Sequence, residues 1–525
     1  MAPPSPFLAL PREIRDAIYE HYVAIPGGYV CDPGRFAANV LERNAASVPK
    51  INITGLLKGA NDQPINLNLS YTCRLIATEM YGVALRANAI TFTTIYCDDL
   101  RMLALRTHNM VVNRLETRRK EILYATSHAM PETQHFALLQ KYPQFAVLLD
   151  ALRKQPGADT IQFHLGNIEA CEAPSVFATL CKEALRHVQG SRHGHEALDH
   201  HCDGVSSVLG MIESSMEHWD IPLDGDLDAM ASFWDEGEDT HGLKAALTGR
   251  DRVKYRFSAA AMAILFIKSC NERLQMQLRK IVLDEDRTAV ACPERHALGL
   301  IQFCRQNPLL KIERRVQLWS NALQDEGYSH SMTKYVLRDE WRIQSAQITQ
   351  SIWKWVQEAL ALAPAGMPDN SFSLILDGQP LPNLATQMFQ AVIRRDIAWH
   401  RAWEESLDRG VASLPSVQDF GPWYHLYPGH RFKHLSRAME DMAQQKSVVQ
   451  CNFDVGKAWD VQNIIQEHKD WTARQWAARW PVDYDPASWE TESPLSSWRT
   501  LLEEDLLPEP EGPYERWTED PDDEF

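Results

Sequence analysis

The densest set of metal-binding side chains lies in the run SRHGHEALDHHCDG, residues 191–204. Imidazole and thiolate groups are good zinc ligands, so this run could hold a metal ion that serves hydrolysis. In an HExxH zinc motif the second histidine follows four residues after the first. From His195 that position is Asp199, and His200 is one residue further on, off the helix face. We therefore favour a solvated polar loop and keep a metal-dependent hydrolase using His193–Cys202 as a remote alternative.

A second set of acidic residues resembles the first half of a calcium-binding loop. Asp224, Asp226 and Asp228 have the required spacing. However, Ala229 occupies the sixth place, where the sharp turn needs glycine, and Asp235 occupies the twelfth place in place of glutamate. We favour acidic residues at the N-terminus of a helix, where the helix dipole stabilises negative charge.

A third set, Cys292, His296 and Cys304, could also approach a metal. The pattern of Pro293–Arg305 predicts one helix, which places residue 304 about three turns from residue 292. We therefore expect His296 to be an ordinary core or surface histidine. The sequence contains no phosphate-binding glycine loop, no GxSxG elbow and no CxxC pair. We predict no catalytic, cofactor-binding or metal-binding residue, no cofactor and no enzymatic activity.

Two amphipathic segments near the N-terminus carry the clearest pattern in the chain. In the first, Phe7–Val23, Pro11 marks a helix start, because its φ is already helical and no N–H is needed there. Leu10, Ile14 and Ile18 then recur every four residues. In the second segment, Asn66–Phe92, apolar side chains recur with the same period and are followed by a short strand at Ile90–Phe92. Neither helix can bury its stripe alone. We predict these partner-binding residues: Leu10, Pro11, Ile14, Ile18, Tyr22, Leu69, Cys73 and Ile76.

These segments resemble a known family. LPREIRDAIY resembles the opening helix of F-box and F-box-like proteins of filamentous fungi, and CRLIATEMYGVALRANAITF resembles their second signature. The matching positions are Leu10, Pro11, Glu13, Ile14, Arg15, Ile18, Tyr19, Cys73, Arg74, Ile76, Glu79, Asn88 and Phe92. The resemblance covers residues 7–92 and implies a helical module that docks on the Skp-type adaptor of a cullin–RING ubiquitin ligase.

The resemblance leaves an alternative open. F-box helices normally follow one another closely, whereas here Ala24–Ile65 intervenes, and its Gly and Pro residues predict a loop. The chain is then either a ligase substrate receptor with an unknown client protein, or a scaffold that retains only the F-box-like fold.

Composition limits the class of protein. Of the net charge of −17, the segment Glu503–Phe525 carries −10, from eleven acidic residues and one arginine, which leaves −7 for the rest. A mildly acidic body argues against nucleic-acid binding. The ten dispersed cysteines indicate reduced thiols, and the longest apolar run, Ala259–Ile267, is too short to span a membrane. The N-terminus lacks the basic region of a signal peptide. We expect a cytoplasmic or nuclear protein with no membrane partner.

The expected fold is α+β and predominantly helical, with a small N-terminal helical F-box-like module followed by a large irregular α/β body. The expected domains are the module at 1–95 with a loop insertion at 24–65, a mainly helical region at 96–250, a Trp-rich α/β body at 251–500 and an acidic disordered tail at 501–525. Alternating or compact apolar runs predict further strands. These are Thr160–Leu165, Leu278–Leu283, Lys311–Leu318, Phe372–Leu376 and Ser447–Val455.

The intervening patterns predict helices. They are Asp98–Met130, Phe136–Lys154 with a break at Pro143, Ser175–Val188, Ala197–Trp219, Arg252–Leu274, Glu294–Arg305, Ser331–Leu362, Asn383–Leu407 and Val461–Arg479.

Two other compositional features have both a structural and a functional interpretation. All sixteen tryptophans lie at or after Trp219, and we interpret them as core residues of broad helices, with an aromatic recognition groove for a client as the alternative. The basic cluster Arg114, Arg118, Arg119 and Lys120 is interpreted as the solvated face of a helix, with a nuclear-import or partner-binding patch as the alternative.

Overall fold

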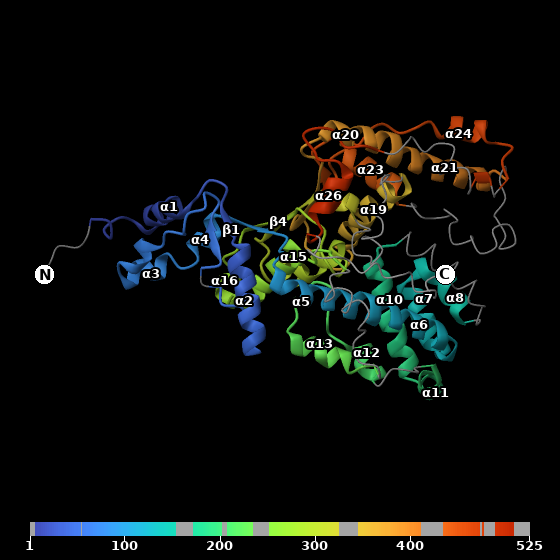
Figure 1. Ribbon diagram of the computed structural model, residues 1–525, viewed down its shortest axis with the longest axis horizontal. Coiled ribbons are helices and arrows are strands. Elements are labelled where there is room, and N and C mark those ends of the chain that lie inside the picture. The colour runs from blue at the N-terminus through green and yellow to red at the C-terminus, as the bar shows by residue number, and fades with distance from the viewer. Residues whose placement is uncertain are drawn as a thin grey trace, which may run out of the picture.

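The computed structural model describes residues 6–53, 55–153, 172–201, 207–234, 251–324, 345–410, 434–472, 475–476 and 489–508. No helix within these ranges is long and apolar enough to cross a bilayer. Helices predominate around one sheet, as expected for a predominantly helical α+β protein (Figure 1).

One seven-stranded sheet organises the chain, in the order β2-β1-β3-β4-β5-β6-β7. β1 and β2 pair antiparallel, and every other neighbouring pair is parallel. The strands are β1 (Tyr29–Cys31), β2 (Leu57–Gly59), β3 (Ala89–Thr93), β4 (Lys280–Glu285), β5 (Lys311–Gln317), β6 (Phe372–Asp377) and β7 (Val449–Cys451). The strands predicted near residues 90, 280, 312, 373 and 449 are therefore confirmed, whereas Thr160–Leu165 lies outside the described residues.

From β1 to β7 the parallel strands follow one another in a single direction across the sheet. Right-handed crossovers then place the connecting helices on the same face. Burial along β5 agrees with this arrangement. Ile312, Arg314 and Val316 are buried, whereas Glu313 is half-buried and Arg315 is exposed. The alternating strand pattern thus separates a helix-covered face from a polar face.

The helix α15 (Ala259–Ser269) lies at the centre of the molecule and packs on β3 and β4. It begins where the Ser258 hydroxyl accepts a hydrogen bond from the Ala261 N–H at 3.0 Å. Residues 259–267 are all buried, which explains why this helix is apolar on every side. The observed helix is thus shorter than the predicted helix Arg252–Leu274. The next helices along the chain are α16 (Glu272–Gln275), η5 (Pro293–Leu300) and α17 (Ile301–Gln306).

The other helices form three groups (Figure 1). At the N-terminal end lie α1 (Arg12–Val23), η1 (Asn68–Tyr71), α3 (Arg74–Glu79) and α4 (Val83–Ala87). The middle group contains α5 (Asp98–His108), η2 (Asn109–Glu116), α6 (Thr117–Thr126), η3 (Ser127–Ala129), α7 (Glu132–Lys141), η4 (Pro143–Phe145), α8 (Ala146–Arg153), α10 (Pro174–Gln189), α11 (Arg192–His201), α12 (Val208–Glu213) and α13 (Asp224–Ala231). The C-terminal group contains α19 (Ser345–Ala361), α20 (Pro382–Met388), η7 (Phe389–Ile393), α21 (Arg394–Asp408), α23 (Leu435–Ala443), α24 (Val461–Glu467) and α26 (Trp498–Glu504).

The insertion Ala24–Ile65 is not a loop, contrary to the prediction. It contributes β1, β2 and the helix α2 (Pro33–Ala46). Asp32 caps α2, since its carboxylate accepts the Arg35 N–H at 3.1 Å, and Pro33 is the first helical residue. The Asp-Pro-Gly sequence that suggests a turn is therefore a helix start.

Three other predicted boundaries are wrong. Residues 192–201 of the polar His-rich run form α11, and the helix predicted from Ala197 to Trp219 does not reach Trp219, because α12 ends at Glu213. In the predicted helix Val461–Arg479, α24 ends at Glu467 and residues 471–472 are not helical, while residues 477–479 lie outside the described residues. The expected tail is folded as far as Pro508, because α26 buries Leu501 and Leu502 and Leu506 pairs with Val253. Residues 509–525 lie outside the described residues.

The buried apolar side chains form two clusters. The large one extends from Cys31 to Leu506 and includes the inner face of the sheet. The small one joins α1 to α3 and α4 at the N-terminal end. β3 pairs with β4, so the sheet connects residues 89–93, from the expected N-terminal module, with the α/β body.

Candidate functional site

The N-terminal helices α1, α3 and α4 pack around their own small core. Tyr19 and Val23 of α1 lie against Ile76, Met80 and Val83, and all five are buried. Phe7 and Leu69 are partly buried and pack against this cluster. The amphipathic period of α1 thus directs one face inward to the module.

A buried ion pair holds α1 to α3. The Arg15 guanidinium donates to Glu79 through Nη2 at 2.6 Å and Nε at 3.0 Å, and the Tyr19 hydroxyl donates to the same carboxylate at 2.7 Å. Arg15 also donates to the Leu10 carbonyl, which fixes the chain before the helix. The hydrogen bonds from Arg15 lower the pKa of Glu79 to about 2, whereas burial and the Glu79 carboxylate raise the pKa of Tyr19 to about 12.

A second polar residue ties the end of α1 to α4. The Asn88 amide donates to the carbonyls of Val23 at 3.0 Å and Ala84 at 2.9 Å, and its oxygen accepts the Ile25 N–H at 2.9 Å. Asn88 is buried, and these bonds satisfy three of its four hydrogen-bonding sites. The polar signature residues Arg15, Tyr19, Glu79 and Asn88 are therefore structural.

The other face of α1 presents apolar side chains to solvent. Ile14 is 50% exposed, Ile18 38% and Tyr22 37%, and these residues are four apart on one side of the helix. Pro11 and Cys73 are exposed, while Leu10 and Leu69 are half-buried. Ile76 was also expected to face a partner, but it is buried in the module core because α3 turns that side chain toward Tyr19. We call Ile14, Ile18 and Tyr22 the α1 face.

The insertion Ala24–Ile65 does not cover the α1 face in its described residues, because Phe36, Ala37 and Val40 of α2 pack into the large core instead. Tyr22 contacts the chain just after the insertion, where its hydroxyl donates to Asn66 Oδ1 at 2.8 Å. The face is therefore accessible to another molecule as far as the described residues show.

The metal-site hypotheses find no geometric support. His193 is almost fully exposed on α11 and lies 3.5 Å from Glu196, while Cys202 and the side chains of residues 199–201 lie outside the described part. Asp224 and Asp228 pair with Arg106, and Asp226 accepts the Leu223 N–H at the start of α13, as the helix interpretation predicts. Within the described residues no three His, Cys, Asp or Glu side chains group as metal ligands.

His296 is a core histidine, as expected. Its Nδ1 lies 2.6 Å from the Ser258 hydroxyl and its Nε2 lies 2.8 Å from the Ala291 carbonyl oxygen. Burial lowers its pKa, so the ring is neutral at pH 7. Both ring nitrogens are thereby engaged.

The tryptophans that the structure describes are mainly packing residues. Trp399 and Trp476 are buried against each other at 5.1 Å between ring centroids, and Trp471 and His468 complete this cluster. Trp353, Trp355 and Trp403 are buried as well. This agrees with the core interpretation and argues against an open aromatic groove formed by these residues.

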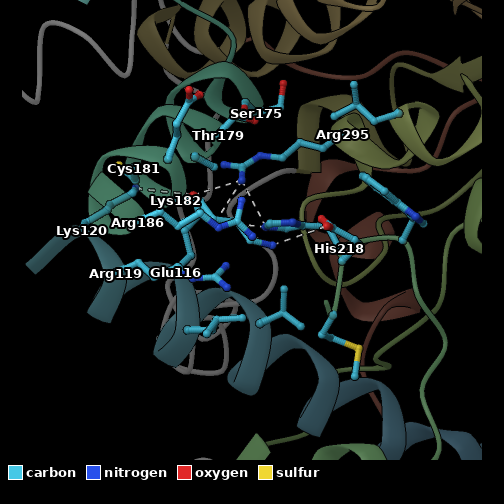
Figure 2. A pocket seen from close by; sticks show the side chains of 18 of the residues that line it. Glu116, Arg119, Lys120, Ser175, Thr179, Cys181, Lys182, Arg186, His218 and Arg295 are labelled. Carbon is cyan, nitrogen blue, oxygen red and sulfur yellow. Dashed lines mark hydrogen bonds and ion pairs between the residues drawn. The ribbon is translucent and has the colours of Figure 1, made fainter. Parts of the chain in front are cut away.

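A cavity of about 560 Å³ lies in the middle group of helices and was not foreseen from the sequence. Its charged side chains come from η2, α6, α7, α10, η5 and the segment before α13, and Figure 2 labels most of them. Six Lys and Arg and three Glu line it: Arg119, Lys120, Lys141, Lys182, Arg186, Arg295, Glu116, Glu183 and Glu217. Its size is in the range of small-molecule sites.

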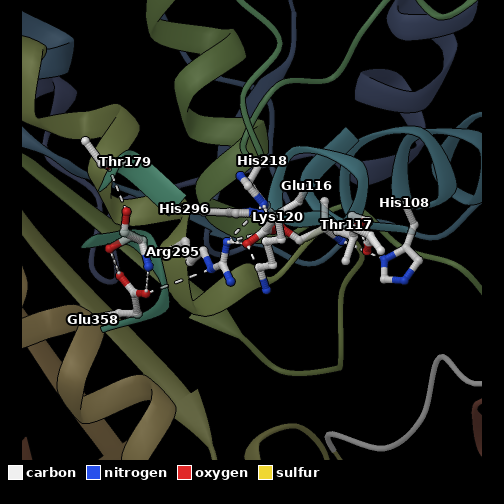
Figure 3. Close-up of polar contacts among 12 residues, drawn as sticks. His108, Glu116, Thr117, Lys120, Thr179, His218, Arg295, His296 and Glu358 are labelled. Atoms are coloured by element: carbon white, nitrogen blue, oxygen red, sulfur yellow. Dashed lines mark hydrogen bonds and ion pairs between the residues drawn. The ribbon is translucent and has the colours of Figure 1, made fainter. Parts of the chain in front are cut away.

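Arg295 connects two carboxylates at the wall of this cavity (Figure 3). Its Nη1 donates to both oxygens of Glu116, at 3.1 and 3.0 Å, and Glu116 also lies 3.0 Å from His218 Nε2. Burial would raise the pKa of Glu116, but Arg295 and His218 lower it well below its usual value. On the other side, Glu358 accepts hydrogen bonds from the Ser175 N–H and hydroxyl, and burial raises its pKa to about 7 despite Arg295.

The basic cluster is not simply a solvated helix face, contrary to the prediction. Arg119 points into the cavity wall and donates to the carbonyls of Met211, Ile212 and Ser214. In the sequence, only the adjacent basic residues Arg119 and Lys120 indicated this site. Lys182 and Arg295 are distant in the sequence and are brought to it by the tertiary fold.

No family model, no curated protein and no solved structure matches this chain.

Proposed function

We propose that this protein is a non-enzymatic interaction adaptor, an F-box-like substrate receptor that docks through the α1 face on the Skp-type adaptor of a cullin–RING ubiquitin ligase. The observation that carries the proposal is the division of α1 into two faces. Arg15, Tyr19 and Val23 face the module, whereas Ile14 and Ile18 remain available.

Apolar side chains that remain exposed at helical spacing are typical of helix-mediated docking. Full burial of an isoleucine side chain contributes about 1.5–3 kcal/mol, so two such residues supply a substantial part of a modest interface. α1 lies at the N-terminal end of the molecule (Figure 1), and the exposure of the α1 face there supports this use.

The test is a pull-down of the purified full chain with a purified Skp-type adaptor. The wild type is compared with Ile14→Asp/Ile18→Asp. We expect the wild type to bind and the double variant to lose binding at least tenfold, because an aspartate in an apolar interface is left without a partner. Both side chains are exposed, so thermal unfolding should change little.

Phe136→Asp is the matched control, since Phe136 is a 59% exposed apolar residue on α7, distant from the α1 face in Figure 1. It should bind like the wild type. If the folded wild type does not bind, the alternative of a scaffold that retains only the F-box-like fold takes precedence, and the ligase proposal fails.

A further inference from the structure

The cavity of the middle group has more positive charge than its own carboxylates compensate. Five of its six cations lie within 4.0 Å of a carboxylate in the described structure. The pairs are Lys141 with Glu183, Arg186 with Glu213, Lys182 with Glu217, and both Lys120 and Arg295 with Glu116. Six cations therefore face these four carboxylates, which leaves a surplus of two positive charges.

The side chains of Arg119 and Lys182 donate hydrogen bonds chiefly to main-chain carbonyl oxygens. Lys182 Nζ donates to the Ser214 carbonyl at 2.9 Å, whereas the Glu217 carboxylate lies 4.0 Å from it. Arg119 donates to the same segment. Burial lowers the pKa of Arg119 to about 10 and also lowers that of Lys182, which the neighbouring charge of Arg119 reduces further. An anion in the cavity would relieve this cost.

Arg295 supplies an independent indication of a ligand. It is 7% exposed, yet its buried Nε has no hydrogen-bond partner. The carboxylate oxygen Glu358 Oε1 lies 3.9 Å from Nε, beyond hydrogen-bond distance. A buried donor without a partner costs about 1–3 kcal/mol, so such a group is expected to find an acceptor. The guanidinium fork suits the oxygens of a tetrahedral or planar oxyanion.

The lining also includes apolar side chains, from Leu115, Met216, Trp219 and Leu298. A ligand that contacts both the cations and these side chains must carry an organic group as well as negative charge. The surplus of two positive charges matches the charge of about −2 on a phosphate monoester at neutral pH.

We propose that this cavity binds a small organic phosphate monoester, with the phosphate beside Arg119, Lys182 and Arg295 and the organic group against Leu115, Met216 and Leu298. The proposal does not rest on docking through the α1 face, because the cavity and that face belong to different groups of helices. Arg119 and Lys182 also fix the segment 211–214, so binding should stabilise this part of the fold.

The test is isothermal titration calorimetry of the full chain at constant ionic strength, with phenyl phosphate as the probe. Inorganic phosphate and benzoate are the comparison ligands. We expect one phenyl phosphate per chain, with at least tenfold weaker binding of inorganic phosphate, which lacks the ring, and of benzoate, which carries one charge. Absence of saturable binding of phenyl phosphate, or equal binding of either comparison ligand, would overturn the proposal.

Two variants locate the site. Lys182→Gln removes one cation, and Ala178→Glu adds a carboxylate to the cavity wall while every cation stays in place. Each should weaken phenyl phosphate binding at least tenfold. Lys446→Gln, at an exposed lysine that contacts Gln444, is the matched control and should bind normally. If Lys182→Gln does not fold, Ala178→Glu decides alone. Unchanged binding by the folded variants would place the ligand elsewhere and reject the site.

Discussion

At the residue scale, the signature positions of the N-terminal module divide into structural and accessible groups. Arg15 and Tyr19 both donate hydrogen bonds to the buried Glu79 carboxylate. The Asn88 side chain accepts a hydrogen bond from the main-chain N–H of Ile25, just after α1. These bonds explain why polar side chains occur on the buried faces of these amphipathic helices. The exposed Ile14 and Ile18 take no part in them, which leaves these residues for intermolecular contact.

Glu79→Gln should strongly destabilise the N-terminal module. The substitution leaves the Arg15 guanidinium, whose side chain is 11% exposed, without its counter-ion. Its charged hydrogen bonds to Glu79 are then lost, which lowers the stability of the contact between α1 and α3. The loss should appear as faster amide exchange in α1 and α3. Glu20→Gln, at an exposed glutamate on α1, is the control and should exchange like the wild type. Equal protection of both variants would show that the pair contributes little.

The same carboxylate should make the module sensitive to acid. The pKa of Glu79 is lowered from 4.5 to about 2 in the folded protein, so the unfolded chain binds more protons in this interval. Its stabilising contribution is complete above about pH 5 and is lost progressively as the pH falls toward 2. The difference in unfolding free energy between the wild type and Glu79→Gln, followed by denaturant titration, should therefore narrow below about pH 5. A difference independent of pH would contradict this account.

For part of this site, the solvent exposure of individual side chains could be predicted from the sequence. The four-residue period placed Ile14 and Ile18 on one side of a helix, and they lie there. Ile76 could not be assigned in the same way. In the six-residue helix α3 both Leu75 and Ile76 are apolar, and only packing against Tyr19 decides that Ile76 is buried while Leu75 is 49% exposed.

At the element scale, a buried charge network connects α15, β4 and β5. Glu285 of β4 accepts the Ala259 and Ala260 N–H groups at the start of α15, and it pairs with Arg314 of β5 at 2.7 Å. Arg314 also donates to the carbonyls of Pro293 and Glu294 and stacks 4.7 Å from the Trp355 ring centroid. One carboxylate thus caps a helix and joins two strands.

Glu285→Gln should cost about 3–5 kcal/mol in unfolding free energy, because Arg314 is then buried without its counter-ion. Glu285→Leu/Arg314→Met should recover only part of the loss, since the N–H groups of α15 and the carbonyl of Pro293 remain unsatisfied. Denaturant titration measures both effects.

The control lies on the same strand. Glu313 and Arg315 form an ion pair whose arginine is 47% exposed, so Glu313→Gln should cost less than about 1 kcal/mol. Equal losses for Glu285→Gln and Glu313→Gln would exclude a special role for the buried pair.

Elements with strong periodicity were predictable, and those defined by tertiary contacts were not. The strands β4, β5 and β6 are short apolar or alternating runs and lie where expected. The sequence of α2 predicts a loop because Pro33-Gly34 resembles a turn signal, although Asp32 and Pro33 start a helix there. The polar run of α11 lacks an apolar stripe, yet it packs on α6 and α10.

At the scale of the whole molecule, the sheet joins distant parts of the chain. β3 lies between β1 and β4, so residues 29–31 and 280–285 flank the same strand. Sequence could indicate that the strands gather into one sheet but not that they follow one another in a single direction, because that order depends on how long connections pack. The charged cavity could not be predicted either, since its walls meet only after this assembly.

The C-terminal segment, residues 498–508, packs on the core and contacts the residues just before α15. Trp498 packs on Trp319 at 6.0 Å between ring centroids, and Leu506 pairs with Val253. Asp505 lies 2.9 Å from Arg256, and the Lys254 N–H donates to the Asp505 carbonyl. All of these contacts come from residues 498–508.

Two truncations test this closure. A chain that ends at residue 508 keeps every one of these contacts and should melt within a few degrees of the full chain, as expected for a change below about 1 kcal/mol. A chain that ends at residue 497 loses four buried apolar side chains, Trp498, Leu501, Leu502 and Leu506, each contributing about 1.5–3 kcal/mol on burial. It also leaves Arg256, 8% exposed, without its carboxylate. Differential scanning calorimetry should therefore show a much lower melting temperature for the shorter chain alone. Equal melting of the two truncated chains would show that residues 498–508 do not hold the core together.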